Sequence, residues 1–166
     1  TLHPAKRDQL RKWFETEGAK LGPGQTLLFY VTDHGERSKD DQTNNTITLW
    51  GENLSVTELR ELFHHVDPRV RIVMLMSQCF SGSFANTIYA DPKNDKPQEN
   101  ICGYFASTAD RPAYACYPEN RGKDGVGLSF HLLEVAEVLG SLPESQLRTL
   151  VTDDSPDVPH TTGNFY

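Results

Sequence analysis

Apolar residues in this chain gather into segments that differ in their spacing. The segments 26–32 (TLLFYVT) and 69–78 (RVRIVMLMSQ) are continuous and rich in β-branched or long apolar residues, which is typical of strands covered on both faces. A third strand is expected over 100–108 and a short alternating strand over 46–50. We expect the strand at 26–32 to lie at the centre of a parallel sheet.

Between these strands, apolar residues recur at helical spacing. Residues 4–20 follow this pattern, and so do residues 51–66, which contain the helix-capping pair Ser55 and Glu58. A further helix is expected over about 127–139. Strands that alternate with helices predict an α/β domain with a mostly parallel sheet, whose ligands bind beyond the carboxyl ends of the strands.

Composition excludes several classes of function. The 166 residues, 37% of them hydrophobic, suit a single domain over 1–166. The net charge of −7 and the lack of a basic cluster argue against nucleic acid as a partner. The longest apolar runs are far shorter than a membrane span. His64 and His65 have no third ligand in register, so we expect no metal site.

Two strand ends carry residues suited to covalent catalysis. The first buried strand is followed by Asp33, His34 and Gly35, and the second by Cys79. The odd total of three cysteines leaves at least one thiol free. Because parallel strands end at the same sheet edge, we expect His34 and Cys79 to meet. An imidazole beside a thiol raises the thiolate fraction and later protonates the leaving amine. The N–H groups of Gly35 and Cys79 would then form an oxyanion hole.

The same residues resemble a known family. YVTDHG at 30–35 resembles the His motif of the legumain-like asparaginyl endopeptidases, the C13 cysteine peptidases of the caspase-like superfamily, and SQCFSGSF at 77–84 resembles their Cys motif. The similarity covers most of residues 25–139. It implies a caspase-like three-layer α/β sandwich with a mostly parallel central sheet flanked by helices. It also implies a cysteine endopeptidase that needs no cofactor and acts on protein or peptide substrates.

The resemblance assigns roles residue by residue. His34 matches the general base and acid, Cys79 the nucleophile and Gly35 the oxyanion-hole glycine. Asp33 matches an Asp that in legumains can cyclise to a succinimide linked to ligase behaviour. The simpler interpretation is that Asp33 tunes His34 electrostatically.

Substrate recognition is expected from a second set of residues. Ala113 and Tyr114 match the edge that pairs with an extended substrate, and Ser107 at its strand end is within reach of the specificity pocket. Legumains carry a Glu where this chain has Ser77, and Asp124 is a candidate for a second acid of the pocket. The resemblance implies Asn as the favoured P1 residue, with Asp possible. An Arg or Lys preference remains open if Asp33 or Asp124 faces the pocket.

The first two strands of the family have no counterpart in this chain. We expect an upstream chain segment to complete the sheet, so that residues 1–166 form a domain incomplete at its N-terminus and aggregate when expressed alone. The polar loop 90–100 is a candidate processing site for a zymogen as well as an ordinary solvated loop. Two further functions stay open, namely a transamidase that passes the thioester to an amine and a catalytically silent scaffold that binds peptides.

Overall fold

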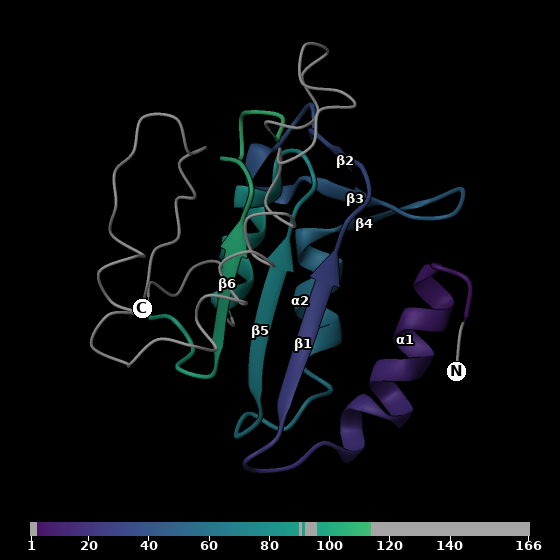
Figure 1. Cartoon of the computed structure of the whole chain (residues 1–166), viewed down its shortest axis with the longest axis vertical. Helices are drawn as coiled ribbons and strands as arrows, with labels where there is room; N and C mark the ends of the chain where they lie inside the picture. The colour runs from purple at the N-terminus through teal and green to yellow at the C-terminus, as the bar shows by residue number, and fades with distance from the viewer. Residues whose placement is uncertain (1–2, 90, 92–95, 114–166) are drawn as a thin grey trace, which may run out of the picture.

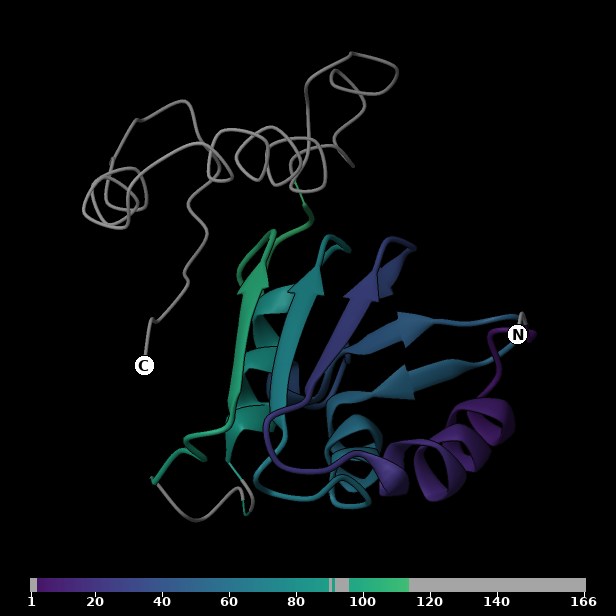
Figure 2. The ribbon, with the colours of Figure 1, turned by 60° about the horizontal axis from the view of Figure 1, so that its bottom comes forward.

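A computed structural model describes residues 3–89, 91 and 96–113 of the chain (Figure 1). Its centre is a parallel sheet in the order β1-β5-β6, formed by Thr26–Val31, Arg71–Met76 and Ile101–Phe105. Val31 pairs with Met76, and Met76 with Phe105, so the three strands end at one level. Figure 2 shows their arrowheads along a common edge. The mostly parallel α/β sheet predicted from the sequence is confirmed.

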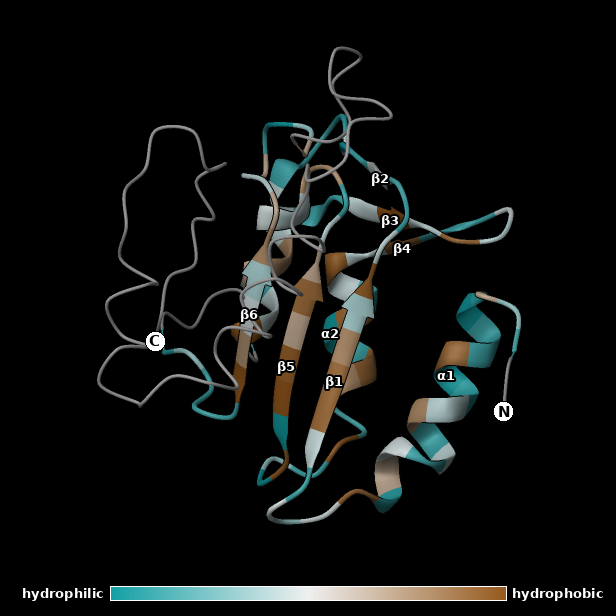
Figure 3. Cartoon of the chain, in the orientation of Figure 1, coloured by the Kyte–Doolittle hydropathy of each residue, from teal (hydrophilic) through white to brown (hydrophobic). Residues whose placement is uncertain are grey.

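One face of the sheet packs on helices through a shared hydrophobic core. Ile72, Met74 and Met76 of β5 are all buried, and they belong to the same core as the buried side chains of α2 (Val56–Phe63) and η3 (Ser81–Ile88). Figure 3 shows the brown, apolar stretches along β1 and β5 that this packing requires. The core therefore fixes the height at which the loops after β1 and β5 leave the sheet.

The connection from β1 to β5 contains a second sheet, of which the sequence pattern predicted only the strand expected over 46–50. Its three short antiparallel strands, joined in part by the turn η2 (Gln42–Asn44), are β2 (Gly35–Glu36), β3 (Thr46–Thr48) and β4 (Asn53–Ser55). The helix expected over 51–66 accordingly begins later, at Val56. Its capping box is as predicted, because Ser55 accepts the Glu58 N–H and the Glu58 carboxylate accepts the Ser55 N–H.

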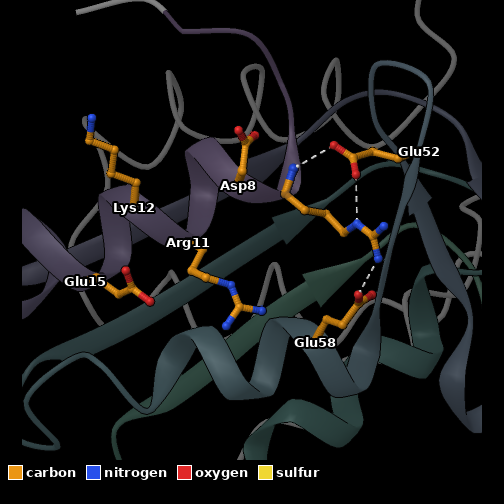
Figure 4. Close-up of a pocket in the computed structure, with 7 residues that line it drawn as sticks. Asp8, Arg11, Lys12, Glu15, Glu52 and Glu58 are labelled. Atoms are coloured by element: carbon orange, nitrogen blue, oxygen red, sulfur yellow. Dashed lines mark hydrogen bonds and ion pairs between the residues drawn. The ribbon is translucent and has the colours of Figure 1, made fainter.

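The N-terminal helix α1 (Arg7–Thr16), followed by η1 (Gly18–Lys20), packs beside α2. The rings of Phe14 and Phe63 lie 5.9 Å apart between the two helices. At the rim of this contact, Arg7 bonds to the carboxylates of Glu52 and Glu58 at 2.9 and 2.7 Å, in a shallow groove of about 380 Å³ (Figure 4). These exposed ion pairs orient α1 along α2.

β1 does not occupy the position expected for it. Among the described residues it lies at the edge of the parallel sheet, and Leu28 and Tyr30 on its outer face are 58% and 49% exposed. The expectation of a central strand is therefore wrong for the part of the chain that the structure describes. A continuous apolar run fits a strand whose alternate residues face a core just as well as one buried on both faces.

Several sequence predictions concern residues outside the described ranges. These are the helix expected over 127–139, Tyr114, Asp124 and part of the processing loop. Within the described ranges, no helix is long and apolar enough to cross a membrane. The same ranges contain no group of three or more His, Cys, Asp or Glu side chains arranged to hold a metal ion.

Candidate active site

The candidate site lies at the carboxyl edge of the parallel sheet, where three loops follow β1, β5 and β6 (Figure 2). The first loop carries His34, whose side chain is exposed and whose N–H donates to the Asp33 carboxylate at 2.7 Å. The second loop carries Cys79, a free cysteine with only 7% of its surface exposed. The loops are thus brought to one edge, as the strand pattern predicted.

Gly35 and Cys79 touch through their backbones. A Cβ atom built on Gly35 would overlap the carbonyl oxygen of Cys79, and it would lie 2.9 Å from Cγ of Gln78. Every other residue type carries that Cβ, so glycine is required here by space and not by backbone torsion. The contact fixes the residue after His34 directly against the Cys79 backbone.

The N–H of Gly35 points away from the small antiparallel sheet. The Thr48 N–H donates to the His34 carbonyl at 2.9 Å, which makes the neighbouring Gly35–Ile47 pair a non-hydrogen-bonded one. Among the described residues, neither the Gly35 N–H nor the Cys79 N–H donates to another group. Both backbone N–H groups therefore remain without an acceptor among the described residues.

A strained turn follows Cys79 directly. Phe80 has φ 58°, the left-handed region, and is the one non-glycine residue with positive φ in the described ranges. Such a conformation costs on the order of 1–3 kcal/mol and persists where surrounding contacts impose it. Here the Phe80 N–H donates to the Arg111 carbonyl at 2.9 Å, and the Phe80 carbonyl accepts the Ser83 hydroxyl at 3.1 Å. The turn directs the chain from β5 into η3.

Ser81 and Ser107 fasten the Cys79 turn to the end of β6. Both side chains are buried, at 0% and 6% exposure, and each backbone N–H donates to the other residue's hydroxyl oxygen, at 3.2 and 3.1 Å. Gly82 lies against the same segment, because a Cβ there would be 2.7 Å from the Ser107 carbonyl oxygen. The structure thus gives Ser107 a partner inside the protein, and its reach into a specificity pocket stays a prediction.

Of the remaining residues expected to bind substrate, two lie within the described ranges and two lie outside them. Ser77 is half-buried, and its hydroxyl donates to the Val31 carbonyl at 2.8 Å, which prolongs the pairing of β1 with β5. Ala113 is buried at 3% exposure. The positions of Tyr114 and Asp124 fall outside the described residues.

Two buried polar side chains were not singled out from the sequence. Gln78, next to Cys79, is 1% exposed, and its amide has no hydrogen-bond partner in the described part of the chain. Asn45 is fully buried and hydrogen-bonds to the loops around Cys79. Neither could have been recognised, because their burial results from contacts between segments far apart in sequence.

Comparison with known proteins identifies the family. No curated protein matches the chain at a significant level. Among solved structures, the protein GSU0716 from Geobacter sulfurreducens is similar with a TM-score of 0.40 and 22% sequence identity, over 45% of this chain. The chain spans 31% of that protein's length.

The model of the peptidase C13 family matches residues 15–138, which include both loops of the candidate site. The chain therefore belongs to the peptidase C13 family, the legumain-like cysteine peptidases with a caspase-like fold.

Proposed function

We propose that the protein is a cysteine endopeptidase in which Cys79 is the nucleophile and His34 the general base and acid. The single observation that carries this assignment is the backbone contact between Gly35 and Cys79, which leaves no space for a Cβ. It places the His34 loop against the Cys79 turn, as a Cys-His dyad requires. Membership of a cysteine peptidase family supports the same chemistry.

The reaction follows from the groups at this edge. The Cys79 sulfur attacks the substrate carbonyl carbon, and the resulting oxyanion accepts hydrogen bonds from the N–H groups of Gly35 and Cys79. His34 receives the thiol proton and passes it to the leaving amine, so that a thioester remains. Water, deprotonated by His34, then hydrolyses the thioester and releases the thiol.

We propose a preference for Asn at P1, with Asp as a second substrate. Ser77 stands where legumains have an acid, and its hydroxyl is engaged with the Val31 carbonyl. The pocket thus lacks the negative charge that this acid supplies in legumains, and Asp124 is the candidate for the second acid of the pocket. The Asp33 carboxylate accepts the backbone N–H of His34, and we assign Asp33 an electrostatic effect on the dyad and no role in the pocket.

The test is turnover of fluorogenic peptides that differ only at P1, over about pH 4–8, with the natural full-length protein beside its Cys79→Ala variant. Cleavage after Asn that disappears in the variant would support the proposal. Cleavage after Arg or Lys would keep the dyad and overturn the Asn preference. An added amine nucleophile distinguishes a transamidase, which would form the amide product. Absence of both turnover and Cys79 labelling by a peptide electrophile would favour a silent scaffold.

A further inference from the structure

The loops around Cys79 share one buried side chain that has no part in the proposed chemistry. Asn45 lies between η2 and β3 and is 0% exposed. Its amide nitrogen donates to the carbonyl oxygens of Phe80 at 3.3 Å and Ala109 at 2.8 Å. Its amide oxygen accepts the N–H of Ser38 at 2.9 Å. The three partners belong to three separate loops at the carboxyl edge of the sheet.

A carboxamide suits this set of partners better than any other side chain of its size. It offers two N–H donors on one side and an acceptor oxygen on the other. The two carbonyls need the donors, and the Ser38 N–H needs the acceptor. Aspartate would turn a carboxylate oxygen toward two carbonyls, and alanine would leave three backbone groups without this partner. The match indicates that the residue type at position 45 is specified by the loops it joins.

Phe80 is the partner that connects Asn45 to catalysis. It follows Cys79 directly, and its positive φ persists only while neighbouring contacts impose it. The Asn45 amide nitrogen is one of those contacts, and the amide oxygen holds Ser38, which follows the short strand β2 that begins next to His34. Loss of the amide would let the Cys79 turn relax relative to the segment from His34 to Ser38.

We propose that Asn45 is a positioning residue that keeps the Cys79 turn and the His34 loop in catalytic register. The inference rests on the proposed function of Cys79 and His34 and adds a residue that touches neither the substrate nor the reacting atoms. Displacement of a reacting group by about 1 Å can cost about a hundredfold in rate. A relaxed turn should therefore lower kcat much more than it raises KM.

The experiment compares Asn45→Ala and Asn45→Asp in the natural full-length protein. Alanine removes all three hydrogen bonds, whereas aspartate retains an acceptor for Ser38 and removes both donors. We expect kcat, corrected for the fraction of active sites, to fall by about 10–100-fold in both variants, with KM within about twofold. The matched control is Asn100→Ala, because Asn100 donates to the Val70 carbonyl at 2.9 Å at the opposite edge of the sheet. That control should leave kcat unchanged.

Labelling of individual cysteines separates positioning from simple loss of structure. A peptide-directed electrophile requires the assembled site, whereas iodoacetamide reports the accessibility and thiolate fraction of a thiol without a bound peptide. In the Asn45 variants we expect the peptide probe to react with Cys79 about tenfold more slowly, while iodoacetamide rates stay within about threefold. Cys102, an exposed free cysteine on β6, is the internal reference for iodoacetamide.

Two results would overturn the positioning role. One is a folded Asn45→Ala variant with unchanged kcat and probe rate. The other is failure of both Asn45 variants to fold while Asn100→Ala folds, since Asn45 would then serve stability alone. Cys79→Ala distinguishes the two proposals. Turnover that persists in it overturns the proposed function, whereas turnover lost in it but kept in Asn45→Ala overturns only the role of Asn45.

Discussion

The two edges of the parallel sheet are formed by the same three strands, yet they differ in how much polar chemistry is buried. At the carboxyl edge, Asn45, Ser81 and Ser107 are buried and hydrogen-bonded between loops. At the amino edge, polar side chains line an open groove of about 650 Å³, and the ion pair of Asp67 with Arg69 is exposed. One edge is held by internal contacts, whereas the other is solvated.

This difference shows at which edge of the sheet the fold requires one arrangement of its loops. Buried polar groups are costly unless every partner is in place, so they specify one arrangement of the loops that carry them. Exposed charges tolerate many arrangements and contribute little to stability. We therefore expect substitutions to be severe at the carboxyl edge and mild at the amino edge.

The largest effect should come from the nucleophile. Cys79→Ala removes the attacking sulfur, and we expect kcat/KM for peptide cleavage to fall by about four orders of magnitude or more. Cys102→Ala is the matched control, because Cys102 is an exposed free cysteine on β6. Equal activity losses in the two variants, measured with one fluorogenic peptide, would contradict the assignment.

Gly35→Ala should have the next largest effect. The new methyl group would overlap the Cys79 carbonyl and displace the proposed oxyanion donors, so we expect a loss of about 10²–10³-fold in kcat. The corresponding change at the amino edge is Gly22→Ala, where the methyl group has no neighbour within 4 Å. Steady-state kinetics of the two variants test whether the carboxyl edge lacks space for a single methyl group.

Ser81→Ala should lower stability more than activity. It leaves the buried Ser107 N–H without its acceptor, so we expect the free energy of unfolding to fall by about 1–3 kcal/mol. Gln25→Ala is the amino-edge control, since the side chain of exposed Gln25 accepts the Gly22 N–H and the backbone carbonyl that accepts the Arg71 N–H is retained. We expect it to change that free energy by less than about 0.5 kcal/mol. Urea denaturation of both variants measures the difference.

The smallest effect should come from Asp67 at the amino edge. Hydrogen bonds from the side chain and backbone of Arg69 lower the pKa of Asp67 from 3.8 to about 2. Because the folded-state pKa is the lower one, the unfolded chain takes up this proton first, and the stabilisation present above pH 3.8 is lost as the pH falls toward 2. Asp67→Asn should thus melt slightly lower than the wild type at neutral pH, and thermal melts should converge in acid. A difference in melting temperature between the variant and the wild type that widened in acid would contradict this direction of the pH effect.

The sequence predicted the strands that precede His34 and Cys79 better than the contacts that hold their loops. His34 and Cys79 follow apolar runs that correspond to β1 and β5 within a few residues, and the Ser55 capping box is a local signal. Asn45 and Phe80 had no such signal. The burial of Asn45 and the backbone torsion of Phe80 depend on partners 7 to 64 positions away.

Most of the small antiparallel sheet was missed for a related reason. The strand expected over 46–50 corresponds to β3, whereas β2 and β4, of two and three residues, are too short to show a periodicity. The edge position of β1 was missed because its apolar run is the same whichever neighbours it has. The sequence predicted the family and the parallel sheet, while tertiary contacts determine the loops that complete the site.

The contact between Gly35 and Cys79 also has a consequence for folding. It joins segments about 45 residues apart, and it can form only when β1 and β5 pair in the register that sets Val31 against Met76. Closing a loop of that length carries an entropic cost that local structure cannot offset. During synthesis, a nascent chain that ends before β5 therefore contains His34 without Cys79, and the proposed site can form only with the long-range pairing of the sheet.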